Sequence, residues 1–415
     1  MKVLLLSNLF PTSRDRSRGI FVAQLAQALS RHCEVHALVP LPWFPSGRLA
    51  WTLAPGYAEQ FADLSARMQF GAVSAHYARY PFFPRLGRRW HAQLMYWGIL
   101  QRARELHQRI GFDLINAHWL DPDGIVASRI AEELKLPLVL SARGCDVNVY
   151  AHDRVRRGGI LRAIGRSSAV TAVSAPLKEG LLSEGIAPDL VTVIPNGVDT
   201  QLFQPRTARD CRAALSLPLD RELVVCVSRL SPEKGVDVLV RAFAQLRKEH
   251  PGAGLAFVGA GPMLAELTEL ADALEVREAV RFVGAVGHDE VPLWLGAASL
   301  VCMPSLREGH PNAAMEALAC GRPVVASAVG ALPEIVREGS GLLVEPGDPR
   351  ALSSALSKAL AIDWDPGRIA EGVRGASWEN AAASYLRVYE RALDEKRTRA
   401  PDASSALRAG SWQTR

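Results

Sequence analysis

Two series of short apolar segments, separated by amphipathic stretches, constrain the fold of this chain more than any other feature. The first series comprises 3–7, 35–40, 113–118, 136–142, 168–174 and 190–195. The second begins near 222 and continues with 254–261, 280–286, 298–305, 322–330 and 341–347. Strands that are apolar along their whole length are typical of parallel sheets covered by helices on both faces. The sequence therefore predicts an α/β protein with two parallel-sheet domains.

The length of 415 residues suits two such domains. We place the first at 1–195, a hinge at 196–205, where an Asn-Gly pair and a proline fall, and the second at 206–375. Two sheets joined in this way place the carboxyl ends of their strands on either side of a cleft. A last helix at 376–395 is expected to pack back on the first domain, and 396–415, which lack periodicity, to be disordered.

Charge and cysteine content narrow the range of partners and compartments. The net charge of +5 is uneven, because basic residues outnumber acidic ones before the hinge and the balance reverses after it. A basic first domain suits an anionic substrate or surface, and no nucleic-acid-binding motif accompanies it. Six cysteines without a CxxC pair predict free thiols in a reducing compartment. With neither a signal peptide nor an apolar run of roughly 18 residues, we expect a cytoplasmic protein, at most peripheral at the inner membrane face.

The stretch SLREGHPNAAMEALACGRPVV at 305–325 combines a strand exit, a helix start and two acids. Pro311 suits the first helical turn and Gly321 the end of that helix. A helix N-terminus offers free N–H groups to a phosphate. Glu308 precedes this helix and Glu316 lies about one turn inside it. From spacing alone, these acids are either ligand contacts or a loop charge and an exposed helix residue.

This stretch and several others resemble the retaining family 4 glycosyltransferases of the GT-B fold. The resemblance includes the E-x7-E spacing, ALACGRPVV, VGALPEIV, SRLSPEKGVDVLV (228–240), FVGAGPM (257–263), VRFVGAV (280–286) and VTVIPNGVD (191–199). The N-terminal segment is similar to the subgroup acting in bacterial cell-surface polysaccharide synthesis. The resemblance implies two Rossmann-like domains facing a central cleft, with the acceptor on the first and a nucleotide sugar on the second.

The resemblance also implies roles in the second domain. Glu308 would contact the donor sugar near its C3 hydroxyl, and Glu316 the ribose hydroxyls. Arg229 and Lys234 would neutralise the leaving diphosphate, work that positioned cations can do without a metal. Phosphate contacts would come from the backbone of Gly309, His310, Pro311 and Asn312. The implied donor is a UDP- or GDP-sugar, used as a substrate, with no cofactor and no metal.

In the first domain the implied assignments rest on fewer residues. Gly19 is the one glycine in a loop where the family usually has a glycine-rich diphosphate site. His118 ends a strand and matches a family histidine that contacts the donor sugar or the acceptor. A lone histidine can equally be structural. Arg143 and Asp146, in SARGCDVN with Gly144, follow another strand and are expected near the acceptor or the donor sugar.

Two further patterns suggest other chemistries. Asp121 and Asp123 match a DxD metal motif, but a three-residue match is common by chance and two α/β domains argue against the fold that uses it. Gly259 and Gly261 follow a strand as in a dinucleotide fingerprint, yet Leu264 occupies the position of the third glycine. We therefore expect neither a metal site nor NAD binding.

Residues 77–109 interleave arginines with Tyr, Phe and Trp. This composition suits peripheral contact with an anionic membrane, although a helix from about 90 to 107 also needs an apolar face for packing. Both interpretations stay open.

The sequence and the resemblance together predict a retaining, hexosyltransferase-type glycosyltransferase. Its expected acceptor is a glycan, lipid-linked and used in cell-surface polysaccharide synthesis. Two alternatives are a catalytically silent glycosyltransferase-like scaffold and a related enzyme with a soluble acceptor such as a sugar phosphate.

Overall fold

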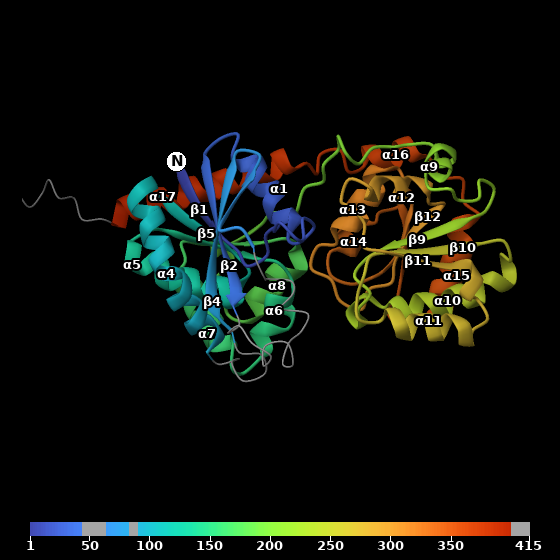
Figure 1. Cartoon of the computed structure of the whole chain (residues 1–415), viewed down its shortest axis with the longest axis horizontal. Helices are drawn as coiled ribbons and strands as arrows, with labels where there is room; N and C mark the ends of the chain where they lie inside the picture. Colours follow the sequence, from blue (N-terminus) through green and yellow to red (C-terminus); the bar gives the residue numbers. More distant parts are fainter. Residues whose placement is uncertain (44–63, 83–89, 400–415) are drawn as a thin grey trace, which may run out of the picture.

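Two sheets organise residues 1–43, 64–82 and 90–399, the part of the chain that the computed structural model describes (Figure 1). The first sheet has eight strands in the order β3-β4-β2-β1-β5-β6-β7-β8, and the second has six in the order β11-β10-β9-β12-β13-β14. All neighbours run parallel except β3 and β4. The predicted fold of two parallel-sheet α/β domains is confirmed.

The strands of the first domain are β1 (Lys2–Leu6), β2 (Glu34–Trp43), β3 (Arg67–Phe70), β4 (Val73–Pro81), β5 (Leu114–His118), β6 (Leu138–Ala142), β7 (Ala169–Ala172) and β8 (Val191–Val193). Its longer helices are α1 (Ile20–Leu29), α4 (His91–Ile110), α5 (Ile125–Leu134), α7 (Arg157–Gly165) and α8 (Ala175–Ser183), with a short α6 (Cys145–Asn148). Along β1, Val3 and Leu5 pack on one face with α1, whereas Leu4 and Leu6 pack on the other with α4 and α5. This alternation follows from the two-residue period of a strand.

The second domain repeats the arrangement. Its strands are β9 (Leu223–Val227), β10 (Gly254–Val258), β11 (Val280–Gly284), β12 (Leu300–Met303), β13 (Val324–Ser327) and β14 (Gly341–Val344). Its helices are α9 (Ala208–Ala214), α10 (Val236–Glu249), α11 (Leu264–Ala273), α12 (Val291–Ala297), α13 (Asn312–Ala319), α14 (Leu332–Ile335), α15 (Pro349–Leu360) and α16 (Pro366–Glu371). Hydrophobic cores pack against both faces of the sheet around its central strands. Four of the six cysteines of the chain are buried as free thiols, whereas Cys145 is exposed.

The segment 77–109 differs in part from the expected membrane-facing surface. Its beginning belongs to β4, which pairs with β2. Tyr80 is buried on the sheet face covered by α4, and Tyr77 is buried on the opposite face, in the core that includes α1. Trp90 and Trp97, seven residues apart at the start of α4, are exposed by 61% and 62%. The arginines at 85, 88 and 89 lie outside the described residues. No helix in the described ranges is long and apolar enough to cross a membrane.

The chain crosses between the domains twice, at neighbouring positions. The Val198 N–H donates to the Ala376 carbonyl at 2.8 Å, so the segment after β8 runs beside the one that precedes α17 (Trp378–Arg399). Helix α17 then lies against the first domain, where it appears in red beside blue and cyan elements (Figure 1). The helix continues to Arg399, past the predicted end at 395, and the expected tail from 400 onward lies outside the described residues.

The hydroxyl of Tyr389 ties α17 to the first sheet, because it donates to Asn116 Oδ1 at 2.9 Å in the buried core. We expect Tyr389→Phe to lower the free energy of unfolding by about 1–2 kcal/mol, since it leaves a buried acceptor unpaired. Tyr96→Phe, which removes a more exposed bond to Glu133, should cost less than about 0.5 kcal/mol. Urea unfolding measures both changes, and equal costs would argue against this role of α17.

Candidate active site

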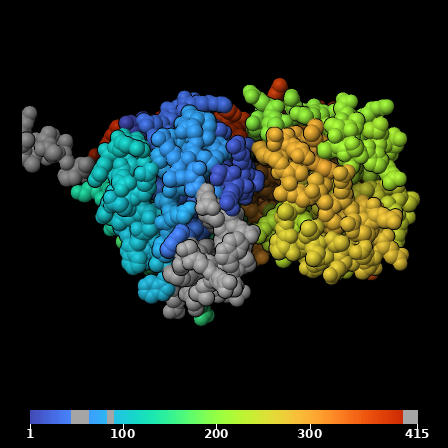
Figure 2. All heavy atoms as spheres, in the orientation of Figure 1, coloured from blue at the N-terminus to red at the C-terminus, as the bar shows by residue number. Residues whose placement is uncertain are grey.

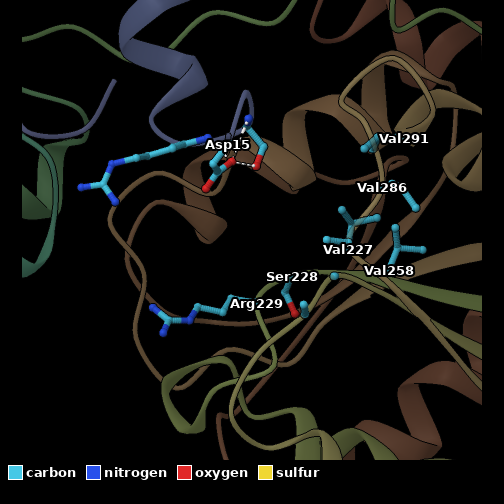
Figure 3. A pocket seen from close by; sticks show the side chains of 12 residues that line it. Asp15, Val227, Ser228, Arg229, Val258, Val286 and Val291 are labelled. Carbon is cyan, nitrogen blue, oxygen red and sulfur yellow. Dashed lines mark hydrogen bonds between the residues drawn. The ribbon is translucent and has the colours of Figure 1, made fainter. Parts of the chain in front are cut away.

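Two adjoining hollows occupy the cleft between the domains. The larger, about 670 Å³, is lined by the loop before α1 and by the ends of β9, β10 and β11 (Figure 3). The other, about 520 Å³, is lined by residues 143–150 of the first domain and 303–313 of the second, among others. Both share Val227, Ser228 and Arg229, so they form one continuous cleft. Figure 2 shows α1, in dark blue, against the second domain, where Gln24 lies 3.2 Å from His288 across the boundary.

The larger hollow is apolar on one side and polar on the other. Val227, Val258, Val286 and Val291 gather together, while Arg229 and Asp15 lie away from them (Figure 3). An apolar slot beside a cation suits a nucleobase followed by phosphate groups. Arg229 is exposed and lines both hollows, as the prediction for a diphosphate contact requires.

A buried ion pair forms the centre of the second hollow. Glu308 is 8% exposed, and its Oε1 lies 2.6 Å from Lys234 Nζ and 2.7 Å from the hydroxyl of Ser305. The turn that carries Lys234 can approach only because Gly235 has a positive φ and no side chain; a Cβ there would lie 2.1 Å from the Pro304 carbonyl oxygen. Two predicted site residues, far apart in sequence, thus meet as a fixed carboxylate and ammonium.

Glu316 is in a different environment. It lies in α13, partly buried, and its carboxyl group has no hydrogen bond or ion pair within the described part of the chain. Burial raises the pKa of its carboxyl to about 7. It does not line either hollow, so a contact with ribose hydroxyls stays a prediction.

A chain of hydrogen bonds connects His118 to the second domain. The guanidinium of Arg143 donates through Nε to His118 Nδ1 at 3.1 Å and through an amino group to Asn196 Oδ1 at 2.7 Å. Asn196 in turn donates to Asn312 Oδ1 at 2.9 Å. The chain passes through the hinge to the first residue of α13.

This chain defines the state of His118. Burial and the adjacent Arg143 hold the pKa of its imidazole well below the usual range, so the ring is neutral. Since Nδ1 accepts, the proton resides on Nε2, which is buried and has no partner in the described structure. His118 is 1% exposed and lines neither hollow, so its contact with the donor sugar or the acceptor stays a prediction. His310 is also held neutral, because burial lowers its pKa to about 4.

Asp146 serves its own loop rather than the cleft wall. It is fully buried, and its carboxylate accepts from the backbone N–H groups of Leu120, Arg143, Gly144 and Val147 at 2.7–3.2 Å. Burial raises the pKa of this carboxyl, an effect that these hydrogen bonds oppose. The side chain therefore shapes the loop at 143–148, and a direct acceptor contact by Asp146 is not what the geometry favours.

Gly144 and Gly309 bring the two domains into backbone contact. A Cβ on Gly309 would lie 2.4 Å from the Arg143 carbonyl oxygen and 2.9 Å from Gly144 Cα. Beside this contact, Pro311 and Asn312 line the cleft at the start of α13. Gly19 does not line it. A Cβ on this glycine, which has φ 57°, would collide with the Leu9 carbonyl, so Gly19 shapes the loop while Ser17 and Arg18 line the hollow.

The two alternative motifs have structural explanations. Asp121 forms an ion pair with Arg156, with 3.3 Å between its Oδ2 and the Nη1 of the arginine. Asp123 accepts a hydrogen bond from the Asn8 N–H at 2.6 Å. Within the described ranges, no group of three or more His, Cys, Asp or Glu is placed to hold a metal. Gly259 and Gly261 allow close packing of their loop on the backbone of Ser228 and Leu230.

Three contributors to the cleft were missed by sequence reasoning. Asn196 was assigned only to a turn, because the Asn-Gly pair indicates a turn and says nothing of the contacts that the asparagine side chain makes. Arg307 lines the cleft and was unremarked, although it adjoins Glu308. Asn148 donates to the Glu308 carbonyl at 3.3 Å, and no local pattern indicates this contact between the domains.

Comparison with known proteins agrees with this geometry. Residues 19–202 match the sequence model of glycosyltransferase family 4, and residues 208–374 match that of glycosyl transferases group 1. The D-inositol 3-phosphate glycosyltransferase of Acidothermus cellulolyticus is 40% identical over 328 residues, which cover 72% of this chain and 71% of that protein. A protein of the same name from a Nocardioides species is 33% identical over 326 residues, covering 71% and 70%.

Solved structures show the same architecture. A sucrose-phosphate synthase from Thermosynechococcus elongatus aligns with a TM-score of 0.76 and 23% identity, over 95% of this chain and 100% of that one. The Anabaena protein HepE, solved with UDP and glucose, aligns with a TM-score of 0.65 and 22% identity, over 96% and 99%. The fold is therefore GT-B. The chain belongs to the family 4 glycosyltransferases.

The raised pKa of Glu316 predicts that its carboxyl group lowers the free energy of unfolding in a pH-dependent way. A carboxyl with a pKa near 7 in the folded state favours folding below its ordinary value near 4.5, and this contribution is lost as the pH rises through about 7. Glu316→Gln should therefore raise the free energy of unfolding by about 1–3 kcal/mol at about pH 8 and change it little at about pH 4. The exposed Glu338→Gln is the control, and a pH-independent difference would contradict the environment described for Glu316.

The contact at Gly309 predicts that a methyl group there disturbs domain closure. Gly309→Ala is expected to lower kcat/KM roughly 10–100-fold, because the cleft residues of the two domains no longer meet at their present spacing. Gly252→Ala, where a Cβ meets nothing within 4 Å, is the matched control. Unchanged kinetics in Gly309→Ala would show that the backbone contact is not needed.

Proposed function

We propose that this glycosyltransferase moves a sugar from a nucleotide diphosphate donor to a small soluble acceptor that carries hydroxyl and phosphate groups, with retention of the anomeric configuration. The observation that carries the proposal is the convergence of Arg143, Arg229, Lys234 and Arg307 on one cleft beside the buried carboxylate of Glu308. Both reactants are then anionic, and positioned cations attract and orient such groups. The relatives named D-inositol 3-phosphate glycosyltransferases support a soluble phosphorylated acceptor.

The cleft residues suggest a division of labour. Arg229 and Lys234 stabilise the charge that develops on the departing diphosphate, so no metal is required in this scheme. Glu308, held by Lys234, accepts a hydrogen bond from a donor-sugar hydroxyl, and the neutral His118 donates one. These contacts fix the anomeric carbon within reach of the acceptor.

Retention is proposed to proceed by attack on the same face. The three carboxylates of the described cleft wall are all engaged: Glu308 with Lys234, Glu233 with the hydroxyl of Ser231 at 2.6 Å, and Asp15 with the hydroxyl of Ser17 at 2.7 Å. In this scheme none of them acts as a covalent nucleophile. The acceptor hydroxyl then bonds to the anomeric carbon as the bond to phosphate breaks, and its proton goes to a diphosphate oxygen.

A soluble acceptor replaces the lipid-linked glycan expected from the sequence, because the similar enzymes are named for a soluble inositol phosphate. Peripheral membrane contact is not part of the proposal. It stays a prediction that rests on the exposed Trp90 and Trp97. A silent scaffold is disfavoured, because such a protein has no need to keep Glu308 buried against Lys234.

The first test is nucleotide binding followed by transfer. We expect UDP or GDP, but not both equally, to raise the thermal unfolding midpoint of the wild type, and Glu316→Ala to lose this shift. The matching UDP- or GDP-sugars are then offered with D-inositol 3-phosphate and hexose phosphates, with and without EDTA, and NMR reports the anomeric configuration of the product. Arg229→Ala should lower kcat by about 100-fold or more, whereas Arg374→Ala, exposed and paired with Glu371, should not.

Other results would redirect the proposal. No shift with any nucleotide would favour the scaffold. Turnover only with lipid-linked glycans would restore the acceptor predicted from the sequence, and an inverted product would exclude same-face attack.

A further inference from the structure

A small cavity of about 210 Å³ lies next to the main cleft and belongs to none of the roles above. The first domain supplies Asn148 and the start of α8 to its wall. The second supplies the segment 306–308 and residues Val329 and Gly330. Asn148, Arg307 and Glu308 line both this cavity and the main cleft. The cavity and the main cleft therefore adjoin at these three residues.

Ser174 is the feature of this cavity that calls for a ligand. It directly precedes α8 and is completely buried, yet its Oγ has no hydrogen-bond partner in the described structure. A serine in this position normally accepts from an N–H of the first helical turn, but here no such bond forms. Pro176, the second residue of the helix, has no N–H to offer, and the N–H of Ala175 donates to Glu334 of the second domain at 3.2 Å. A buried hydroxyl without a partner is costly, and a bound group can remove that cost.

The rest of the wall indicates the chemistry of that group. Leu177, Leu306 and Val329 offer apolar surface to the cavity. The side chain of Leu306 is 39% exposed, although it is apolar. Asn148 uses its amide nitrogen on the Glu308 carbonyl, so its Oδ1 remains to accept a hydrogen bond. Apolar contacts combined with a hydroxyl and an amide oxygen suit a polyhydroxylated ring, which has C–H faces and hydroxyl edges. Arg307, at the opening between cavity and cleft, suits a phosphate on the same molecule.

The cavity is better placed for the acceptor than for the donor. The nucleotide is expected in the larger hollow near Arg229, which shares no wall residue with this cavity. The cavity adjoins the part of the cleft that holds Glu308, because Asn148, Arg307 and Glu308 line both. A group that occupies the cavity is the part of the acceptor that does not react.

We propose that this cavity is a second subsite of the active centre, which takes the non-reacting ring portion of a phosphorylated polyol acceptor through Ser174 and Asn148. The inference rests on the proposed function, because it needs a soluble acceptor. It makes Ser174 a determinant of acceptor selection with no part in donor binding.

Ser174→Ala tests this role, and Ser183→Ala is the matched control. Ser183 lies at the other end of the same helix, and its exposed hydroxyl bonds to the Gly180 carbonyl. The wild-type full chain and both variants are assayed with a saturating donor and varied D-inositol 3-phosphate, or the hexose phosphate that the wild type uses best. We expect Ser174→Ala to raise the acceptor KM by about fivefold or more. Its Tm and the thermal shift given by UDP or GDP should match the wild type, because no hydrogen bond is lost in the free enzyme.

A variant that fills the cavity tests the subsite independently. Val329→Phe places a ring in the cavity and should raise the acceptor KM further than Ser174→Ala does, again without changing the nucleotide shift. A lower Tm in Ser174→Ala would assign the hydroxyl to helix capping and overturn the subsite. So would an unchanged acceptor KM in both variants, which would leave the proposed function intact. If the wild type uses none of the phosphorylated acceptors, both the soluble-acceptor proposal and this inference fall.

Discussion

Direct backbone contact between the two domains, at Gly144 and Gly309, sets the geometry on which the rest of the site depends. Side chains on either residue would separate the loops that carry Arg143 and Glu308. At the present spacing, Arg143 reaches Asn196 and Asn196 reaches Asn312, so a line of hydrogen bonds follows the contact through the hinge. The cleft is therefore assembled by close approach of main chains, with polar side chains that fix its register.

Three carboxylates in or near the cleft are in three different states, and one physical reason, the loss of hydration on burial, explains all three. Glu308 is buried with a cation and a hydroxyl, so its charge is compensated and its direction fixed. Asp146 is buried with backbone donors, which makes it part of its loop. Glu316 is shielded without a partner, and its pKa rises to about 7. Since desolvation disfavours a charge unless something replaces the lost water, only the first two environments are complete without a ligand. The incomplete one is the environment in which a bound hydroxyl has most to contribute.

Those parts of the fold with a strong local signal could be predicted from the sequence. Strands such as β1, β9 and β12 are apolar throughout, because helices cover both of their faces, and this alone indicated two parallel sheets. The edge strand β3 and its neighbour β4 were missed. The tyrosines of β4 suggested an interface with a membrane, but they fill the cores on the two faces of the sheet: Tyr80 beneath α4, and Tyr77 on the opposite face with α1. An aromatic residue next to an arginine looks the same at a surface and at the edge of a core, and only the packing partner decides between them.

The site residues, too, divide into those that could be predicted from the sequence and those that could not. Glu308, Arg229 and Lys234 could be named in advance because each belongs to a recognisable local segment, whereas Ser174 and Asn148 owe their position to contacts between domains that no local segment encodes. This difference bears on acceptor choice. Donor chemistry depends on charged residues within one domain, which a family pattern preserves in a single stretch. In the proposed arrangement, the acceptor meets the surface formed where the two domains come together, and its identity would then depend on pairs of residues more than a hundred positions apart, such as Asn148 and Arg307. Proteins that share every donor motif can therefore differ in acceptor, and the cavity beside Glu308 is the place in this chain where such a difference would be built.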